Sequence, residues 1–138
     1  MCIRDRMAAF GGFLTGKEAA KYMLPRGRGS IFFTGATASV RGGAGFSAFS
    51  GAKFALRSLS QSMARELGPQ GIHVAHFIID GAIDTPFIQE NFPETYALKE
   101  KNGILQPTEI AEAYWSVHVQ HPSAWTQEMD LRPYMEKF

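Results

Sequence analysis

The chain has 138 residues, of which 45% are hydrophobic and 20% charged, and its formal net charge is +1. These values are typical of one globular domain and give no reason to expect a nucleic-acid or polyanionic partner. The single cysteine, Cys2, excludes a disulfide framework and a cysteine-based metal site, and no apolar run is long enough to span a bilayer, so we expect a cytoplasmic protein.

The first six residues, "MCIRDR", differ from the rest of the chain. They are polar and show no periodicity, and a second methionine, Met7, follows them at once. The stretch resembles adapter sequence read through in assembled sequence data, so we expect residues 1–6 to be a non-native leader. On this interpretation, residues 7–138 belong to a domain whose chain begins further upstream.

The first part of the chain predicts a helix, a strand and a loop. Helix-forming residues with an apolar stripe run from Ala8 to Met23, and "LPRGRG" then breaks the helix. The stretch "SIFFT" (Ser30–Thr34) is short and continuously apolar, which predicts a fully buried strand. The small residues of "GATASVRGGAG" (Gly35–Gly45) predict a loop.

A long helix and a second buried strand are expected next. Apolar residues recur at helical spacing from about Ala44 to Leu67, and Gly68-Pro69 ends this helix. The stretch "IHVAHFII" (Ile72–Ile79) predicts a continuous apolar strand, which leads into the loop "DGAIDTP". The segment Pro86–Glu100 is expected to be loosely helical.

The last part of the chain completes an alternating pattern. We expect Thr108 to cap a helix that runs to about Val119, and a last strand lies within Ala124–Pro133. Helices that alternate with continuous apolar strands are typical of an α/β fold with a parallel sheet covered on both faces. Ligands of such sheets bind at the carboxyl ends of the strands, which here lead into "TGATAS" and "IDGAIDT".

Two nucleotide-binding motifs are incomplete or absent. "GGFLTGKE" (Gly11–Glu18) has the glycine and lysine spacing of a phosphate loop, but Glu18 stands where a magnesium-binding Ser or Thr is required. It also lies within a predicted helix with no strand before it. The chain contains no GxGxxG turn, so the residues that would cradle a pyrophosphate are not in this sequence.

The histidines are better explained as structural residues than as metal ligands. His73 and His76 point to opposite faces of one predicted strand and cannot easily share a metal. His118 and His121 are spaced for a helix, but no carboxylate cluster accompanies them. We therefore expect no metal site.

Phe49 and Lys53 lie one turn apart on the long predicted helix. Spacing alone favours a core phenylalanine beside a lysine whose stem packs along the surface. The residues around this pair support a second interpretation.

The stretch from Met7 to Thr85 resembles short-chain dehydrogenases/reductases. "MLPRGRGSIFFTGATAS" is similar to the helix, turn and strand that end in the catalytic serine loop of that family. "FSAFSGAKFALRSLSQSMARELGPQGIHVAHFI" is similar to its Tyr-x-x-x-Lys helix and the next strand, and "DGAIDT" to its Pro-Gly-x-Ile-x-Thr loop. The tail "SAWTQEMDLRPYMEKF" does not resemble the glycine-rich ending of the family.

The resemblance implies the C-terminal half of a doubly wound, Rossmann-type parallel sheet, with the N-terminal dinucleotide-binding half missing. It also implies NAD or NADP as the cofactor of the intact protein, and a homodimer or homotetramer formed through helices 8–23 and 44–67. The substrate is not implied. By analogy, Pro86–Glu100 and Leu131–Phe138 would cover the substrate pocket. Phe87, Phe92 and Tyr96 suggest an apolar lining for it, and packing in the core explains these three residues equally well.

The family's catalytic residues are matched unevenly. Lys53 stands at the lysine that binds the nicotinamide ribose and lowers the pKa of the catalytic tyrosine. Phe49 stands at the position of that tyrosine, and Ala36 at the serine that polarises the carbonyl. Ala8 stands at the asparagine that supports a proton-relay water. The resemblance is therefore to a divergent branch with Phe in place of Tyr.

The cofactor loop is matched more closely. Gly81, Ile83 and Thr85 match residues of the loop that holds the nicotinamide, whereas Asp80 replaces its proline. Together with Lys53, these residues form the cofactor-binding set that the resemblance implies.

Phe49 and Ala36 lack the protons that the usual chemistry requires. General-acid catalysis contributes roughly 10²–10⁴-fold to such reactions, and one oxyanion donor roughly 10²–10³-fold. Lys53 can still bind a ribose, because that role needs only its N–H donors. The nearest candidates for a relocated acid, each explained equally well as a loop or cap residue, are Ser47, Ser50, Thr37 and Asp84.

Two functions remain open from the sequence. The first is an NAD(P)-dependent oxidoreductase with an atypical mechanism. The second is a non-catalytic nucleotide-binding or oligomerisation module of the same fold. Neither involves nucleic acid or a membrane.

Overall fold

The computed structural model of the chain describes residues 6–137. The leader expected over residues 1–6 therefore lies outside the described residues, except for Arg6, at which the first helical turn begins. None of the described helices is long and apolar enough to cross a membrane.

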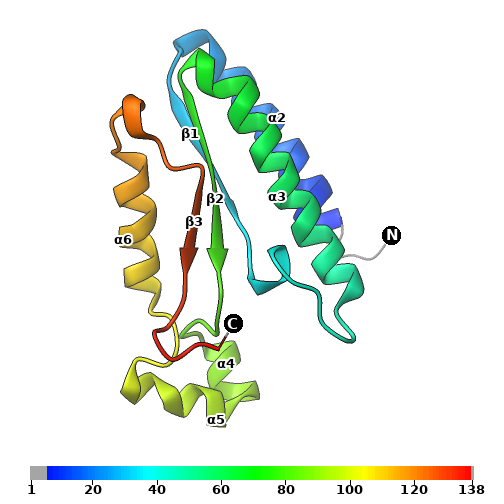
Figure 1. Cartoon of the computed structure of the whole chain (residues 1–138), viewed down its shortest axis with the longest axis vertical. Helices are drawn as coiled ribbons and strands as arrows, with labels where there is room; N and C mark the ends of the chain where they lie inside the picture. Colours follow the sequence, from blue (N-terminus) through cyan, green and yellow to red (C-terminus); the bar gives the residue numbers. More distant parts are fainter. Residues whose placement is uncertain (1–5, 138) are drawn as a thin grey trace.

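The central layer is a parallel sheet of three strands in the order β1-β2-β3. The strands are β1 (Gly29–Thr34), β2 (Ile72–Ile79) and β3 (Glu128–Leu131). All three point toward the end of the molecule where α4, α5 and the C-terminus lie (Figure 1). The parallel α/β architecture predicted from the alternation of helices and apolar runs is thus confirmed.

Helices cover both faces of the sheet. On one face lie α2 (Gly11–Met23), preceded by a π-helical turn at Arg6–Phe10, and α3 (Ser47–Leu67). On the other face lies α6 (Pro107–His118), as Figure 1 shows. The two connections of the sheet therefore lie on opposite faces, because α3 joins β1 to β2 and α6 precedes β3. This is the doubly wound arrangement expected from the sequence.

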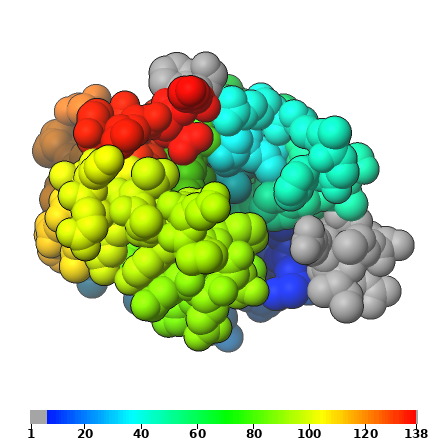
Figure 2. All heavy atoms as spheres, turned by 90° about the horizontal axis from the view of Figure 1, so that it is seen from below, coloured from blue at the N-terminus to red at the C-terminus, as the bar shows by residue number. Residues whose placement is uncertain are grey.

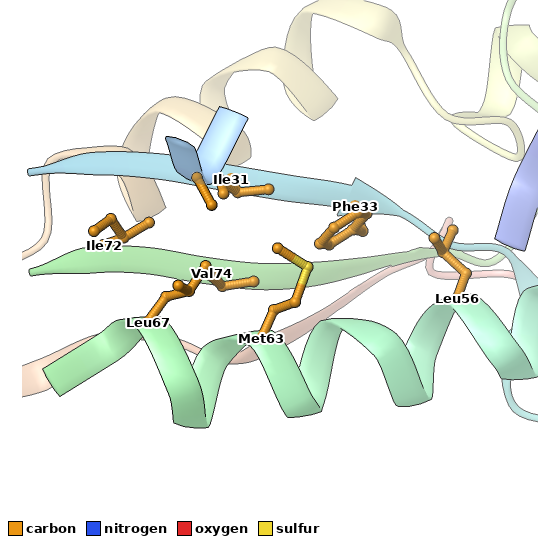
Figure 3. Close-up of a cluster of buried hydrophobic side chains, with 8 residues drawn as sticks. Ile31, Phe33, Leu56, Met63, Leu67, Ile72 and Val74 are labelled. Atoms are coloured by element: carbon orange, nitrogen blue, oxygen red, sulfur yellow. The ribbon is translucent and has the colours of Figure 1, made fainter. Parts of the chain in front are cut away.

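The first half of the core lies between the sheet and α3 (Figure 3). Side chains from β1 and β2 point toward the apolar stripe of α3, and Met63 fills the space between the two strands and the helix. The stripe predicted from helical spacing is buried as expected. The labelled residues of this cluster are Ile31, Phe33, Leu56, Met63, Leu67, Ile72 and Val74.

The second half of the core lies between the sheet and α6. Phe77 of β2 stacks on Tyr114 of α6, with ring centroids 3.7 Å apart and an interplanar angle of 14°. Val117 of α6 is fully buried beside this pair. Since β2 is buried against helices on both faces, its continuous apolar sequence is explained.

The segment between β2 and α6 is helical but broken. It consists of α4 (Pro86–Asn91), α5 (Pro93–Tyr96) and a 3-10 turn at Ala97–Lys101. This agrees with the loosely helical segment expected from Pro86 to Glu100. The prolines at the starts of α4 and α5 explain the break, because proline begins a helix more readily than it continues one.

Two helix starts differ from the predicted ones. The prediction that Thr108 caps the following helix is wrong, because α6 begins at Pro107 after Gln106 and has no side-chain cap. The fixed φ of proline suits the first helical position, so the helix starts one residue earlier. The long helix begins at Ser47 rather than near Ala44, since Gly45 has a φ of +79°.

The predictions for the glycine-rich segment Gly11–Glu18 and for the two histidines of β2 are confirmed. Gly11–Glu18, with its phosphate-loop spacing, is part of helix α2. His73 lies on the α6 face, stacked on Trp125 with ring centroids 4.6 Å apart, whereas His76 faces α3 and the end of β1. Among residues 6–137 there is no group of three potential metal-ligating side chains.

The turn from α3 into β2 depends on Gly71. This residue has a φ of +83°, and a Cβ added to it would lie 2.2 Å from the carbonyl oxygen of Gly27. Gly45 has a similar φ of +79°, but a Cβ there would meet nothing within 4 Å. The two glycines therefore share one backbone requirement and differ in packing.

We expect Gly71→Ala to destabilise the protein more than Gly45→Ala. Both variants lose about 1–2 kcal/mol because alanine is strained at positive φ. Gly71→Ala loses about 1–3 kcal/mol more because the contact is with backbone, which cannot rotate away. Urea unfolding of the two variants beside the unsubstituted protein measures the difference, and equal losses would contradict the role given to the close approach.

Candidate functional site

The residues singled out from the sequence meet at the carboxyl edge of the sheet. The loop after β1, which includes the 3-10 turn Thr37–Ser39, lies next to the loop after β2. Figure 2 looks onto this edge, with the loop after β1 in cyan beside the red tail that follows β3. The structure thus brings together three segments that are far apart in the sequence.

Lys53 reaches the end of β1 from α3. Its Nζ donates a hydrogen bond of 2.9 Å to the carbonyl oxygen of Thr34, the last residue of β1. Burial lowers the pKa of the Lys53 amine. One of the three N–H donors of a lysine is used in this bond, so two remain for a hydroxyl-bearing ligand.

Phe49 and Ala36 border a small pocket beside Lys53. The Nζ of Lys53 lies 5.8 Å from the centroid of the Phe49 ring, within the range of a cation–π contact. The pocket has a volume of about 340 Å³. Small and apolar residues dominate its lining, which consists of Ala36, Thr37, Ala38, Arg41, Gly42, Gly43, Phe46, Phe49, Ile79 and Gly81.

The four candidates for a relocated acid are placed differently. Ser50 is buried and donates to the carbonyl oxygens of Ala38 and Arg41, both at 3.2 Å. Ser47 is exposed at the start of α3, and Asp84 forms an ion pair of 2.8 Å with Lys99. Of the four, only Thr37 lines the 340 Å³ pocket.

The aromatic residues expected to line a substrate pocket lie elsewhere. Phe87 and Phe92 are exposed and contact each other, with ring centroids 6.0 Å apart. The ring of Tyr96 faces the Nζ of Lys99 at 5.4 Å. None of the three belongs to the lining of the 340 Å³ pocket.

The loop from Asp80 to Thr85 is held by hydrogen bonds at both ends. The backbone N–H of Asp80 donates to the carbonyl of Leu131 at 2.8 Å. At the other end, the hydroxyl of Thr85 accepts the N–H of Ile88 at 3.4 Å and donates to the carbonyl of Ile83 at 3.2 Å. The loop is therefore fixed between the tail and α4.

Asp80 forms a contact that the sequence did not predict. The hydroxyl of Thr37 donates to its Oδ1, and Nη1 of Arg132 lies 3.8 Å from its Oδ2. Asp80 is only 2% exposed, so this carboxyl group is held inside the edge of the sheet. Replacement of a proline by Asp was the one signal in the sequence that could have pointed to this contact.

A buried polar network supports the loop from below. Arg57 donates two hydrogen bonds to Glu128, of 2.6 Å to Oε1 and 2.7 Å to Oε2, and the same Oε2 lies 3.0 Å from Nδ1 of His76. The fully buried His76 ring lies against Gly35, where an added Cβ would be 2.3 Å from Nε2. Gly35 is thus required by the His76 ring.

The network perturbs the pKa of each member. Burial lowers the pKa of His76, although its bond to Glu128 acts in the opposite direction. Burial alone would raise the pKa of Glu128, but the hydrogen bonds from Arg57 and His76 outweigh it and hold that pKa below its ordinary value. The bond to Glu128 raises the pKa of Arg57. The ground state is a neutral His76 between a carboxylate and the loop.

This arrangement fits the ribose and nicotinamide end of a dinucleotide. Lys53 offers N–H donors for hydroxyl groups, and the small residues of both loops leave backbone accessible at the pocket. Ligands of open α/β sheets bind at this edge. Of the cofactor-binding residues expected from the sequence, Gly81 lines this pocket, and Lys53 donates to the end of β1 beside it.

Comparison with known proteins gives the same picture. Residues 6–95 match the family described as short chain dehydrogenase. Zerumbone synthase of Zingiber zerumbet is 33% identical over 117 residues, which cover 75% of this chain and 44% of that protein. Xanthoxin dehydrogenase of Arabidopsis thaliana is 37% identical over 84 residues, which cover 61% of this chain and 29% of that protein. The chain thus spans less than half the length of these relatives.

Solved structures match over nearly the whole chain. The crystal structure of a short-chain dehydrogenase from Rhodopseudomonas palustris is 49% identical, with a TM-score of 0.74, and covers 95% of this chain and 50% of its own. A 7α-hydroxysteroid dehydrogenase complexed with NADH is 22% identical, with a TM-score of 0.76, and covers 92% of this chain and 52% of its own. The second likeness shows the fold alone.

The buried network predicts a loss of stability in acid. The pKa of His76 lies below its ordinary 6.5 and that of Glu128 below its ordinary 4.5, so the unfolded chain binds protons first at both groups. The contribution of these two groups to the free energy of unfolding is therefore full above pH 6.5. It decreases as His76 becomes protonated in the unfolded chain, and it decreases further below pH 4.5. Urea unfolding at steps from pH 8 to pH 4 measures the decline.

Glu128→Gln is the matched variant for this measurement. The substitution keeps the shape of the side chain and removes the charge, so we expect the free energy of unfolding to be lower by about 1.5–3 kcal/mol at pH 8. We also expect it to decline less below pH 4.5 than in the wild type. A wild-type curve that is flat down to pH 4.5 would contradict the neutral, buried state of His76.

Proposed function

Since the chain belongs to the short-chain dehydrogenase family, we propose that the protein is an NAD(P)-dependent oxidoreductase whose proton chemistry differs from the usual one. The observation that carries the proposal is Lys53, held at the carboxyl edge of the sheet beside the loop Asp80–Thr85. A bound nicotinamide cofactor would supply or accept the hydride. The chain itself would bind and orient the cofactor and shape the pocket for the substrate.

Lys53 is the residue through which the chain would hold the nicotinamide ribose. Its bond to the carbonyl of Thr34 fixes the direction of the amine, and the N–H groups that remain can donate to ribose hydroxyls. Gly81, Ile83 and Thr85 would place the backbone of the loop along the nicotinamide, as the resemblance implies. Either NAD or NADP would suit these residues.

The pocket lacks the usual proton donors. Phe49 has an aromatic ring at the position of the catalytic tyrosine and lines the pocket. The ring preserves the packing of α3, but it carries no hydroxyl that could donate a proton. Ala36 likewise keeps the loop and removes the hydroxyl. A catalytic version of this site therefore needs a proton-carrying group from elsewhere in the pocket.

We also propose that a segment upstream of Met7 supplies the dinucleotide-binding half. Among the described residues β1 pairs with β2 only, so its other edge is open to a further strand. The sheet face next to this edge has an apolar pocket of about 590 Å³ between β1 and α6. The share of the relatives that the chain covers supports the same proposal.

The outer faces of α2 and α3 are proposed to join copies of the protein. Phe10, Phe13 and Leu14 of the N-terminal helix are each more than two-fifths exposed, and so is Phe54 of α3. Exposed apolar patches of this kind are typical of subunit interfaces. A homodimer or homotetramer through helices 8–23 and 44–67 would bury them.

A non-catalytic nucleotide-binding or oligomerisation module is the second candidate. Phe49 and Ala36 favour it, because neither can donate a proton. Assay of the full-length protein with NADH or NADPH and a panel of carbonyls, or with NAD⁺ or NADP⁺ and a panel of alcohols, separates the two. Turnover supports the enzyme, and tight cofactor binding without turnover supports the module.

We expect Lys53→Met to weaken binding of NADH and NADPH to the full-length protein by about 10–100-fold, since charged hydrogen bonds contribute about 1.5–3 kcal/mol. Lys17→Met is the matched control, because Lys17 is exposed on α2 and away from the edge of the sheet. Fluorescence titration measures both. Equal affinity of the Lys53→Met variant and the wild type would overturn the proposed function.

A further inference from the structure

Asp80 and Thr37 restore a proton path at an edge that has lost its usual donors. The tyrosine and serine positions hold Phe49 and Ala36, yet a buried carboxyl group now stands at the end of β2. The carboxyl group of Asp80 lies next to Thr37, which follows Ala36 in the sequence. A group that can accept a proton is therefore present near Phe49 and Ala36, which have none to give.

Thr37 contacts both the carboxyl group and the pocket. Its hydroxyl donates a hydrogen bond to Oδ1 of Asp80, and the same residue lines the 340 Å³ pocket with Ala36 and Phe49. A hydroxyl that donates one bond still has lone pairs that accept a proton from an alcohol. Thr37 can therefore pass a proton between a substrate in the pocket and Asp80.

We propose that Thr37 is the acid–base residue of this site and that Asp80 is the group that exchanges protons through it. This rests on the proposed function as an NAD(P)-dependent oxidoreductase. In alcohol oxidation, the substrate O–H bond breaks and its proton moves to Oγ1 of Thr37, while the proton of Thr37 moves to Oδ1 of Asp80. The C–H bond breaks with its electron pair as hydride, which NAD(P)⁺ accepts, and the carbonyl forms. Carbonyl reduction is the reverse.

Charged groups of both signs face this part of the edge. Arg132 faces Asp80 from the segment after β3 and is itself bonded to Asp130. Arg41 lines the pocket from the loop after β1, Lys53 lies at the end of β1 from α3, and Glu136 of the tail lies near Gly81. Of these carboxyl groups, Asp80 is the one that already accepts a hydrogen bond from the hydroxyl of Thr37.

The pocket limits the substrate to a small alcohol. Its 340 Å³ is at the low end of ligand pockets, which span about 300–1,000 Å³. Gly42, Gly43 and Phe46 make the wall apolar. A secondary alcohol with small apolar substituents fits this space.

Three substitutions in the full-length protein test the role of the pair. Thr37→Val keeps the shape and removes the hydroxyl, so kcat for alcohol oxidation falls roughly 10²–10⁴-fold. Thr37→Ser keeps the hydroxyl and recovers most of that loss. Asp80→Asn keeps the acceptor for Thr37 but not the base, so kcat falls similarly and its acid-side pH dependence disappears. Thr15→Val, on the exposed face of α2, is the control and leaves kcat unchanged.

Two measurements need no turnover. Thr37→Val, Thr37→Ser and Thr15→Val keep the affinity of the wild type for NADPH or NADH to within about 3-fold, and all four variants still unfold in one cooperative urea transition.

The outcomes separate this inference from the proposed function. Wild-type protein that binds neither NADH nor NADPH overturns both. If the wild type binds cofactor and turns over but kcat is unchanged in Thr37→Val, only the acid–base role of Thr37 and Asp80 is overturned. A kcat of Thr37→Ser that is no higher than that of Thr37→Val overturns it as well. Loss of cofactor affinity and stability in Thr37→Val and Asp80→Asn would show that the contact only holds the loops together, and would also overturn it.

Discussion

The burial of β2 on both faces is the constraint on which the rest of the structure depends. Every residue of Ile72–Ile79 is buried, with α3 on one side and α6 on the other. A strand in this position must pair on both edges, and it does so with β1 and β3. The three strand ends therefore meet at one edge, and the loops that follow them have to form the site together.

The same burial explains the polar network below the site. Two histidines stand in a strand that otherwise holds apolar residues, and each needs a partner because burial of an unpaired polar group is costly. His73 is bonded through Nε2 to the carbonyl of Thr126 at 2.8 Å, and His76 through Nδ1 to Glu128 at 3.0 Å. Glu128 in turn orients Arg57 on α3. Glu128 of β3 thus connects His76 of β2 to the helix that carries Lys53.

The sequence was sufficient to predict the architecture. Continuous apolar runs and apolar residues at helical spacing identify elements locally, so β1, β2, α2 and α3 were predicted close to their observed bounds. Helix starts were less accurate, because Pro107 and Gly45 set them through backbone dihedrals rather than through apolar periodicity. The contacts of Asp80 were not predicted either. They join residues 43 positions apart, and no local pattern marks such a pair.

The cationic side chains near this edge differ in their hydrogen-bond acceptors. Those with a carboxylate partner have a structural role, and Lys53 differs from them. Arg57 is bonded to Glu128, Arg132 to Asp130, and Lys99 to Asp84, so each of these charges is matched by a carboxylate. Among the described residues, Lys53 instead has a backbone carbonyl as its hydrogen-bond acceptor. A half-buried ammonium group without a counter-ion is costly, as the lowered pKa of Lys53 reflects. A purely structural element would be expected to hold an apolar residue at such a position, as it does at Phe49 and Ala36. The retention of Lys53 beside them is therefore explained best by a hydroxyl-bearing ligand that completes its hydrogen bonds.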